Sequence, residues 1–147
     1  EFDPVHPERL ISEPKCLSRP LYGFENTEHT INNEGPYAFY YHNKIYLAYS
    51  GGDARGYLYA IGMLTANDGD DLCDLSVWEK AKTPIASFAT IPGEYGPGHN
   101  SFFWDRDQNL WIAYHAVTSF EEKIVSSGMR RVYFEQDKTP RVDVIVE

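Results

Sequence analysis

A glutamate in a short glycine- and proline-containing motif is suited to acid catalysis. Glu34 lies in Asn33-Glu-Gly-Pro36, where the glycine lets the backbone turn and the proline fixes the start of the following segment. A carboxyl group held on such a turn can serve as a general acid. The alternative is a glutamate in a solvated loop, and the spacing of these four residues does not exclude it.

His99 follows two glycines and a proline in Gly96-Pro-Gly-His-Asn-Ser-Phe102. An imidazole on such a defined backbone can bind a metal, bind a substrate or support a carboxylate; the alternative is a histidine hydrogen-bonded within a tight turn. The sequence contains no His-Glu-x-x-His, Cys-x-x-Cys, Gly-x-Ser-x-Gly or phosphate-loop motif. Zinc catalysis, phosphate binding by a glycine-rich loop and a serine nucleophile elbow therefore lack support in the sequence.

The composition predicts a folded, acidic chain. Its 147 residues carry a net charge of −9 and are 15% aromatic, with eleven tyrosines. The negative charge argues against nucleic acid or an anionic membrane as the main partner, since both favour basic surfaces. The longest run of largely apolar residues, 57–64, is too short to span a bilayer, which takes about 20 apolar residues. Cys16 and Cys73 allow at most one disulfide, and no signal-peptide pattern is visible, so the compartment stays undetermined.

The elements that must position these residues read as short strands. Residues 1–33 hold four prolines and predict mostly loop, with a short strand near 9–12. Many short strands with turn residues between them indicate an all-β sandwich, barrel or propeller. Strands are predicted at 36–41, 44–50, 57–64, 99–104, 109–116, 129–135 and 141–146, with one helical turn within 70–82.

An internal repeat favours the propeller. Residues 33–50 superpose without a gap on residues 98–115, and a third strand follows in each copy. A repeated unit of strand, turn, strand, loop and strand is typical of propeller blades. Glu34 and His99 then occupy equivalent positions before the first strand of each unit, near one mouth of the central channel. An unrelated β-sandwich would instead leave these two residues far apart. The superposed pairs include Phe39 with Trp104, Ile45 with Leu110, Tyr46 with Trp111 and Leu47 with Ile112.

Together the two motifs resemble glycoside hydrolase family 43, five-bladed propellers that act on arabinose- and xylose-containing glycans. The resemblance implies an all-β fold made of blades of a five-bladed β-propeller, incomplete in this chain. Residues 1–33 would be a loop-rich lead-in from a preceding blade, and residues 34–147 the C-terminal blades. Besides the two motifs, the matching segments are 44–50, 59–62, 68–80, 111–115 and 134–140.

The resemblance also implies roles for individual residues. Glu34 matches the general acid of these enzymes, and His99 matches a histidine near the propeller axis that is associated with a central calcium or other cation. Asn33 and Arg130 are expected to bind substrate. An active-site arginine is expected on a late strand, where Arg130 and Arg131 are both near the matching position. Members of the family invert the anomeric centre, so a second carboxylate acts as base across a gap of about 6.5–9.5 Å.

The family's base aspartate and its pKa-tuning aspartate lie well upstream of the Glu-Gly-Pro motif, whereas only 33 residues precede Glu34 here. We therefore expect part of an inverting arabinofuranosidase or xylosidase that is inactive alone. Its partners would be an arabinose- or xylose-containing oligosaccharide and either a missing N-terminal half or a second copy that closes the ring. The alternative is a non-catalytic carbohydrate-binding or interaction module built from propeller blades.

Overall fold

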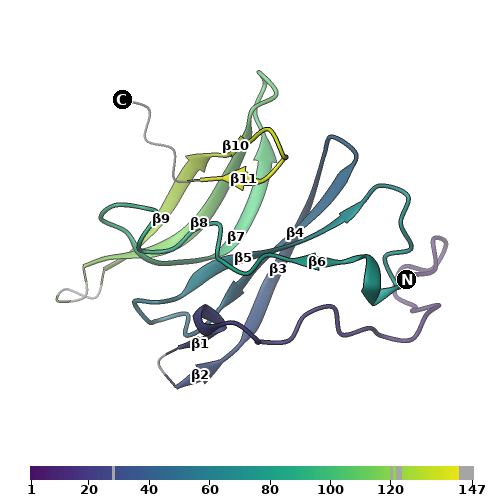
Figure 1. Cartoon of the computed structure of the whole chain (residues 1–147), viewed down its shortest axis with the longest axis horizontal. Helices are drawn as coiled ribbons and strands as arrows, with labels where there is room; N and C mark the ends of the chain where they lie inside the picture. Colours follow the sequence, from purple (N-terminus) through teal and green to yellow (C-terminus); the bar gives the residue numbers. More distant parts are fainter. Residues whose placement is uncertain (28, 120, 122–123, 143–147) are drawn as a thin grey trace.

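The computed structural model describes residues 1–27, 29–119, 121 and 124–142, and most of its regular structure is β-strand (Figure 1). Two antiparallel sheets of consecutive strands contain most of the strand residues. The helices found in the described residues are single 3₁₀ turns, η1 (Gly23–Glu25) and η2 (Leu75–Val77). Neither is long and apolar enough to cross a membrane. The prediction of an all-β fold is confirmed, as is the helical turn expected within 70–82.

The first sheet is a four-stranded meander in the order β3-β4-β5-β6. All neighbouring strands in it are antiparallel, which is the pattern of one propeller blade. Its strands are β3 (Asn33–Tyr41), β4 (Lys44–Gly51), β5 (Ala60–Asn67) and β6 (Glu79–Lys80).

The second sheet repeats this arrangement with three strands in the order β7-β8-β9. They are β7 (Tyr95–Trp104), β8 (Leu110–Ser119) and β9 (Ile124–Arg131). The two sheets are therefore two propeller blades, and the chain holds an incomplete propeller.

Short elements flank the blades. The predicted strand near residues 9–12 is wrong, because that segment makes only one isolated bridge, between Phe2 and Leu10. The strand predicted over 129–135 is divided between β9 and a separate two-residue strand. The strand predicted over 141–146 lies largely outside the described residues. The remaining strands are β1 (Asn26–Thr27), β2 (Thr30–Ile31), β10 (Tyr133–Phe134) and β11 (Pro140–Arg141).

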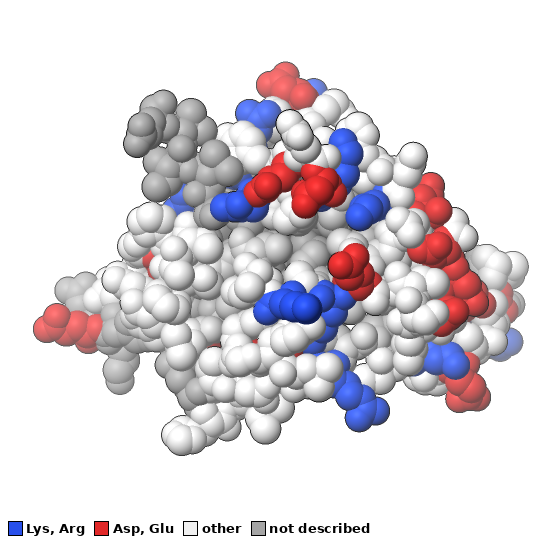
Figure 2. Space-filling view, viewed as in Figure 1, with Lys and Arg blue, Asp and Glu red and all other residues white. Residues whose placement is uncertain are grey.

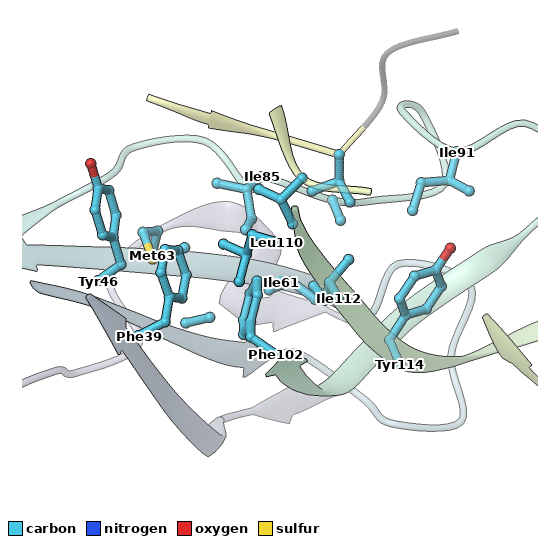
Figure 3. Packing of buried hydrophobic residues seen from close by; sticks show 14 of the residues in the cluster. Phe39, Tyr46, Ile61, Met63, Ile85, Ile91, Phe102, Leu110, Ile112 and Tyr114 are labelled. Carbon is cyan, nitrogen blue, oxygen red and sulfur yellow. The ribbon is translucent and has the colours of Figure 1, made fainter. Parts of the chain in front are cut away.

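The hydrophobic core lies between the two blades (Figure 3). Phe39 of β3 stacks on Tyr46 of β4, with ring centroids 4.8 Å apart, and meets Phe102 of β7 at 4.5 Å. Ile61 of β5 and Ile112 of β8 are fully buried in the same cluster. Aromatic side chains thus fill the space between twisted sheets, which accounts for much of the aromatic excess of the composition.

The predicted repeat holds for the second strand of each hairpin. Tyr49 of β4 pairs with Gly62 of β5, and Tyr114 of β8 pairs with Gly128 of β9. In both pairs the tyrosine ring occupies the space that a Cβ on the glycine would take. Because Tyr49 and Tyr114 superpose in the predicted repeat and make the same contact, this part of the superposition is confirmed.

The superposition is wrong by one residue for the first strand of each hairpin. Tyr40 pairs with Ile45 in the first blade, whereas Trp104 pairs with Leu110 in the second. Since Ile45 is the counterpart of Leu110, Trp104 is the counterpart of Tyr40 and not of Phe39. The second hairpin has one more residue in its turn, which an alignment without gaps cannot accommodate.

This correction changes the relation between Glu34 and His99. Glu34 pairs with Ser50, and the residue of β7 that pairs with the counterpart of Ser50 is Gly98. The counterpart of His99 is therefore Gly35, and both have left-handed backbones, with φ of 51° and 56°. Both residues also lie within their strands, not before them as predicted. Glu34 and His99 are thus not equivalent positions, although both lie in the first half of their strands, β3 and β7.

Candidate active site

Glu34 lies near the start of β3, at a β-bulge that shifts the pairing with β4 between Glu34 and Tyr37. Its carboxylate Oε1 accepts a hydrogen bond of 2.7 Å from the hydroxyl of Tyr59, just before β5. Tyr59 is fully buried, whereas Glu34 is only partly exposed. The carboxyl group is therefore held at one oxygen by a rigid donor.

His99 lies beside the Glu34 motif. A Cβ at Gly35 would be 3.4 Å from Nδ1 of His99, so the glycine brings the β3 backbone against the imidazole. The backbone N–H of His99 donates a 2.7 Å hydrogen bond to Oγ of Ser50, the strand partner of Glu34. The structure therefore brings the Glu34 and His99 motifs together as predicted, and the unrelated β-sandwich is wrong.

Two rings complete the cluster around Glu34. The ring of Tyr59 stacks on His115 of β8 at 5.6 Å and an interplanar angle of 10°, and His115 lies 6.4 Å from the ring of His99. A Cβ at Gly98 would overlap the ring of Tyr59, so only glycine permits this approach. Burial raises the pKa of the Tyr59 hydroxyl, and the Glu34 carboxylate raises it further while a hydrogen bond from Ser50 opposes the change. Tyr59 therefore stays protonated and acts as a donor.

Asn33 takes part in a network of side-chain hydrogen bonds next to Glu34. Its amide Nδ2 donates to Oε1 of Glu25 at 2.8 Å, and its Oδ1 accepts from Ser18 at 2.7 Å. Glu25 is fully buried and also accepts from Tyr49 at 2.8 Å and from Lys80 at 2.5 Å. The structure thus shows Asn33 tying the lead-in segment to the first blade, and its binding of substrate stays a prediction.

Several hydrogen-bond donors stabilise the ionised form of Glu25. Burial alone would raise the pKa of its carboxyl group, but the Lys80 ammonium and the other hydrogen-bond donors hold that pKa below its ordinary value. Two of those donors are the backbone N–H groups of Leu21 and Tyr22, each 2.7 Å from Oε2. Glu25 is therefore an ionised anchor for the lead-in.

Arg130 makes an equivalent network in the second blade. Its guanidinium donates to Oε1 of Glu94 at 2.7 Å and to the hydroxyl of Tyr114 at 2.8 Å, and Tyr114 donates to Glu94 at 2.6 Å. Tyr114, Glu94 and Arg130 thus reproduce the trio of tyrosine, glutamate and basic side chain formed by Tyr49, Glu25 and Lys80. These contacts turn Arg130 toward Glu94 and not toward the Glu34 cluster, and its binding of substrate stays a prediction.

The sequence model of glycosyl hydrolases family 43 matches residues 7–140. The chain belongs to glycosyl hydrolase family 43. The resemblance identified from the two motifs is confirmed over nearly the whole chain.

Relatives of this family 43 chain include characterised arabinofuranosidases. It is 38% identical, over 76% of its length, to the extracellular exo-alpha-(1->5)-L-arabinofuranosidase of Streptomyces chartreusis, and 28% identical, over 97%, to that of Streptomyces avermitilis. It covers 34% and 31% of these proteins. The crystal structure of an alpha-L-arabinofuranosidase from Lactobacillus brevis matches with a TM-score of 0.79 and 29% identity over 90% of this chain and 42% of that one. The chain thus spans about a third of the length of those curated relatives.

The described residues do not form a calcium cage around His99. Among them, the group of three metal-ligating side chains close enough to share an ion is Glu1, Asp71 and Cys73, which does not include His99. Calcium takes six to eight oxygen ligands, whereas an imidazole offers nitrogen. A calcium ion beside His99 would therefore need oxygen ligands other than such a group of side chains, and a central cation stays a prediction.

Sequence reasoning missed three residues of the Glu34 cluster: Ser50, Tyr59 and His115. Tyr59 and His115 lie in segments that match the family, but neither stands in a pattern that marks chemistry. These residues belong to the cluster because of the strand face on which each lies. The one-residue error in superposing the first strands concealed which residues share a face. Gly98 was the sequence signal that could have pointed to them, since a glycine within a strand marks a site where another group approaches the backbone closely.

Figure 2 shows the distribution of charge on one face of the molecule. Lysine and arginine side chains are interspersed with aspartate and glutamate there, and the described residues form no continuous basic surface on that face.

Proposed function

We propose that this chain is part of an inverting glycoside hydrolase that removes terminal arabinofuranosyl residues from glycans, with Glu34 as the general acid. The observation that carries the proposal is the Glu34 carboxyl group held by Tyr59 beside the His99 motif, at the shared end of two propeller blades. The arabinofuranosidase relatives, at 28% to 38% identity, favour an arabinofuranosyl substrate over a xylosyl one.

Glu34 would protonate the glycosidic oxygen of the leaving group. Water would attack the sugar carbon from the opposite face, activated by a base carboxylate about 6.5–9.5 Å away. Tyr59, Ser50, His99 and His115 surround Glu34, and none of them carries a carboxylate. The base and the tuning aspartate would therefore come from a partner part of the protein, either an N-terminal half or a second copy.

The other predicted groups would act on the substrate around this acid. His99 is the exposed ring of the cluster and is placed to contact a sugar or a water on a cation. Asn33 and Arg130 would bind substrate only if they exchange part of the contacts that the structure shows for them. An arabinose-containing oligosaccharide is the proposed ligand.

Hydrolysis of an aryl α-L-arabinofuranoside by the product of the complete coding sequence tests the proposal. We expect turnover with release of arabinose as the inverted anomer, observed by proton NMR before mutarotation. Glu34→Gln should lower kcat/KM by about 10²- to 10⁴-fold, the usual contribution of an acid catalyst. Residues 1–147 alone should show no turnover.

Two results would overturn the proposal. Unchanged turnover by Glu34→Gln on a substrate with a poor leaving group would remove Glu34 from the acid role. Binding of arabino-oligosaccharide without any hydrolysis by the complete protein would instead support a non-catalytic carbohydrate-binding module.

A further inference from the structure

Three buried tyrosines donate to glutamates in this structure, and one of these pairs stands apart. Tyr49 with Glu25 and Tyr114 with Glu94 repeat from blade to blade, each beside a basic side chain. A contact that recurs in every blade is explained by blade assembly. The pair that does not recur calls for another explanation.

Tyr59 and Glu34 form the pair without a counterpart. The register given by Gly62 and Gly128 puts Val125, which is 63% exposed, in the place of Tyr59 in the second blade. The counterpart of Glu34 there is a glycine. No lysine or arginine accompanies this pair among the contacts of the described residues, unlike the other two pairs, so blade assembly does not account for it.

The hydrogen bonds around Tyr59 run in one direction. The backbone N–H of His99 can only donate, so Ser50 Oγ accepts from it at 2.7 Å. The Ser50 hydroxyl also contacts the Tyr59 oxygen, and because the proton of Tyr59 goes to Glu34, Ser50 can only be the donor between the two hydroxyls. Tyr59 in turn donates to Glu34 Oε1 at 2.7 Å. Ser50 and Tyr59 are fully buried, so water offers these groups no alternative partner.

We propose that Ser50 and Tyr59 are positioning residues that fix Oε1 of Glu34 as an acceptor and so assign the catalytic proton to Oε2. This inference rests on the proposed role of Glu34 as general acid. With Oε1 occupied by the Tyr59 donor, the carboxyl proton has only Oε2 to sit on. The backbone N–H of His99 binds Ser50 at the other end of this series of hydrogen bonds. The His99 motif and the acid therefore keep one fixed geometry.

The positioning matters most while the proton moves. The Oε2–H bond of Glu34 breaks and an O–H bond forms on the glycosidic oxygen, which keeps the electron pair of its breaking bond to the sugar carbon. Water, deprotonated by the base carboxylate, supplies the oxygen that replaces it. The Glu34 carboxylate that results is charged, so the bond from Tyr59 becomes charge-assisted and strengthens as the proton leaves.

The test uses the product of the complete coding sequence and a series of aryl α-L-arabinofuranosides, from dinitrophenyl to unsubstituted phenyl. Tyr59→Phe keeps the ring on His115 and removes only the hydroxyl. We expect kcat/KM on the phenyl substrate to fall roughly tenfold or more, through kcat, because a poor leaving group needs the proton. The dinitrophenyl substrate, which leaves without a proton, should be turned over at the wild-type rate.

Tyr49→Phe is the matched control, because it also removes a hydrogen bond from a buried tyrosine to a glutamate in the same blade. Tyr49→Phe should change kcat/KM by the same factor for every substrate in the series. Ser50→Ala is a second probe, expected to change the leaving-group dependence in the same direction as Tyr59→Phe. The double variant should lose no more than Tyr59→Phe alone, because Ser50 acts through Tyr59.

Glu34→Gln in the same series separates the two proposals. If Glu34→Gln shows the leaving-group dependence and neither Tyr59→Phe nor Ser50→Ala does, the positioning role is refuted while the acid role stands. If Glu34→Gln lacks the dependence, the acid role fails and the positioning role with it. A uniform fall across all substrates for Tyr59→Phe, as for Tyr49→Phe, would also refute the positioning role.

Discussion

Replacing Lys80 by methionine tests how strongly the lead-in segment is anchored to the first blade. Glu25 is fully buried, and Lys80, with a side chain 13% exposed, is its basic partner at 2.5 Å. Removing one partner of a buried ion pair costs about 3–5 kcal/mol, because the remaining charge stays in a medium of low polarity. Methionine retains the length and the apolar stem of the lysine, so the loss reports mainly on the charge.

The expected loss is somewhat below that range, because Glu25 keeps four other hydrogen-bond donors. The backbone N–H groups of Leu21 and Tyr22, the amide of Asn33 and the hydroxyl of Tyr49 remain in place. We therefore expect Lys80→Met to lower the free energy of unfolding by about 2–4 kcal/mol at pH 7. Urea denaturation followed by tryptophan fluorescence measures this change.

The pH dependence distinguishes a charge effect from a packing effect. The pKa of Glu25 is lowered in the folded protein, so its ionised form stabilises the fold above the unfolded pKa, and this contribution is lost as the pH falls through the folded pKa. Loss of Lys80 raises the folded pKa, so the variant protonates Glu25 earlier on acidification. The difference from the wild type should therefore narrow as the pH is lowered from 7 toward 4.

Lys82→Met is the matched control, because Lys82 is exposed and two residues away. It should change stability by less than about 0.5 kcal/mol. The reasoning is refuted if Lys80→Met costs no more than this control at pH 7. It is also refuted if the cost stays constant down to pH 4, since a charge-independent loss would mean that packing explains it.

Three further substitutions test the fold and the site. Gly98→Ala should lower the free energy of unfolding by about 1–3 kcal/mol in thermal unfolding, because its Cβ would overlap the buried ring of Tyr59. A Cβ at Gly23 meets no neighbour within 4 Å, so the control Gly23→Ala should lower it by less than about 1 kcal/mol. Equal losses would contradict the close contact between Gly98 and Tyr59. Phe39→Ala should lower the free energy of unfolding by about 3–5 kcal/mol in urea denaturation, and Phe103→Ala, at a side chain 42% exposed, by much less. The reverse order would contradict the packing of Phe39 in the core. Arg130→Met should lower the free energy of unfolding by about 1–2 kcal/mol, because it removes the hydrogen bonds from Arg130 to Tyr114 and Glu94 and leaves these two residues only the bond between them. An unchanged melting temperature would show that these contacts do not stabilise the second blade.

The sequence was sufficient for the class of fold and for the neighbourhood of Glu34 and His99. Short aromatic strands and a repeated hairpin point to propeller blades, and the two motifs fall on matching ends of β3 and β7. Such features depend on local pattern, which one sequence carries. The one-residue error in the first strand has a physical cause: a longer turn does not change the hydrophobic pattern on either side of it.

The roles of Asn33 and Arg130 show where pattern stops being informative. Each lies where the family resemblance expects a substrate contact, yet each is engaged with a glutamate outside its own strand. Arg130 and Glu94 are 36 residues apart, and Asn33 and Glu25 meet only because the lead-in folds back on β3. Pairings of this kind depend on the direction of side chains across sheets, which spacing in the sequence does not determine.

The repeat offers a physical means of separating structural carboxylates from functional ones. Glu25 and Glu94 each bind a buried tyrosine and a basic side chain, so their charges are neutralised inside the fold. Glu34 also binds a buried tyrosine, but no cation balances it among the described residues, and it remains partly exposed. A carboxyl group held at one oxygen and left without a counter-charge can give up and regain a proton without breaking the fold. That difference, visible only when the blades are compared, supports the proposal that Glu34 is the general acid.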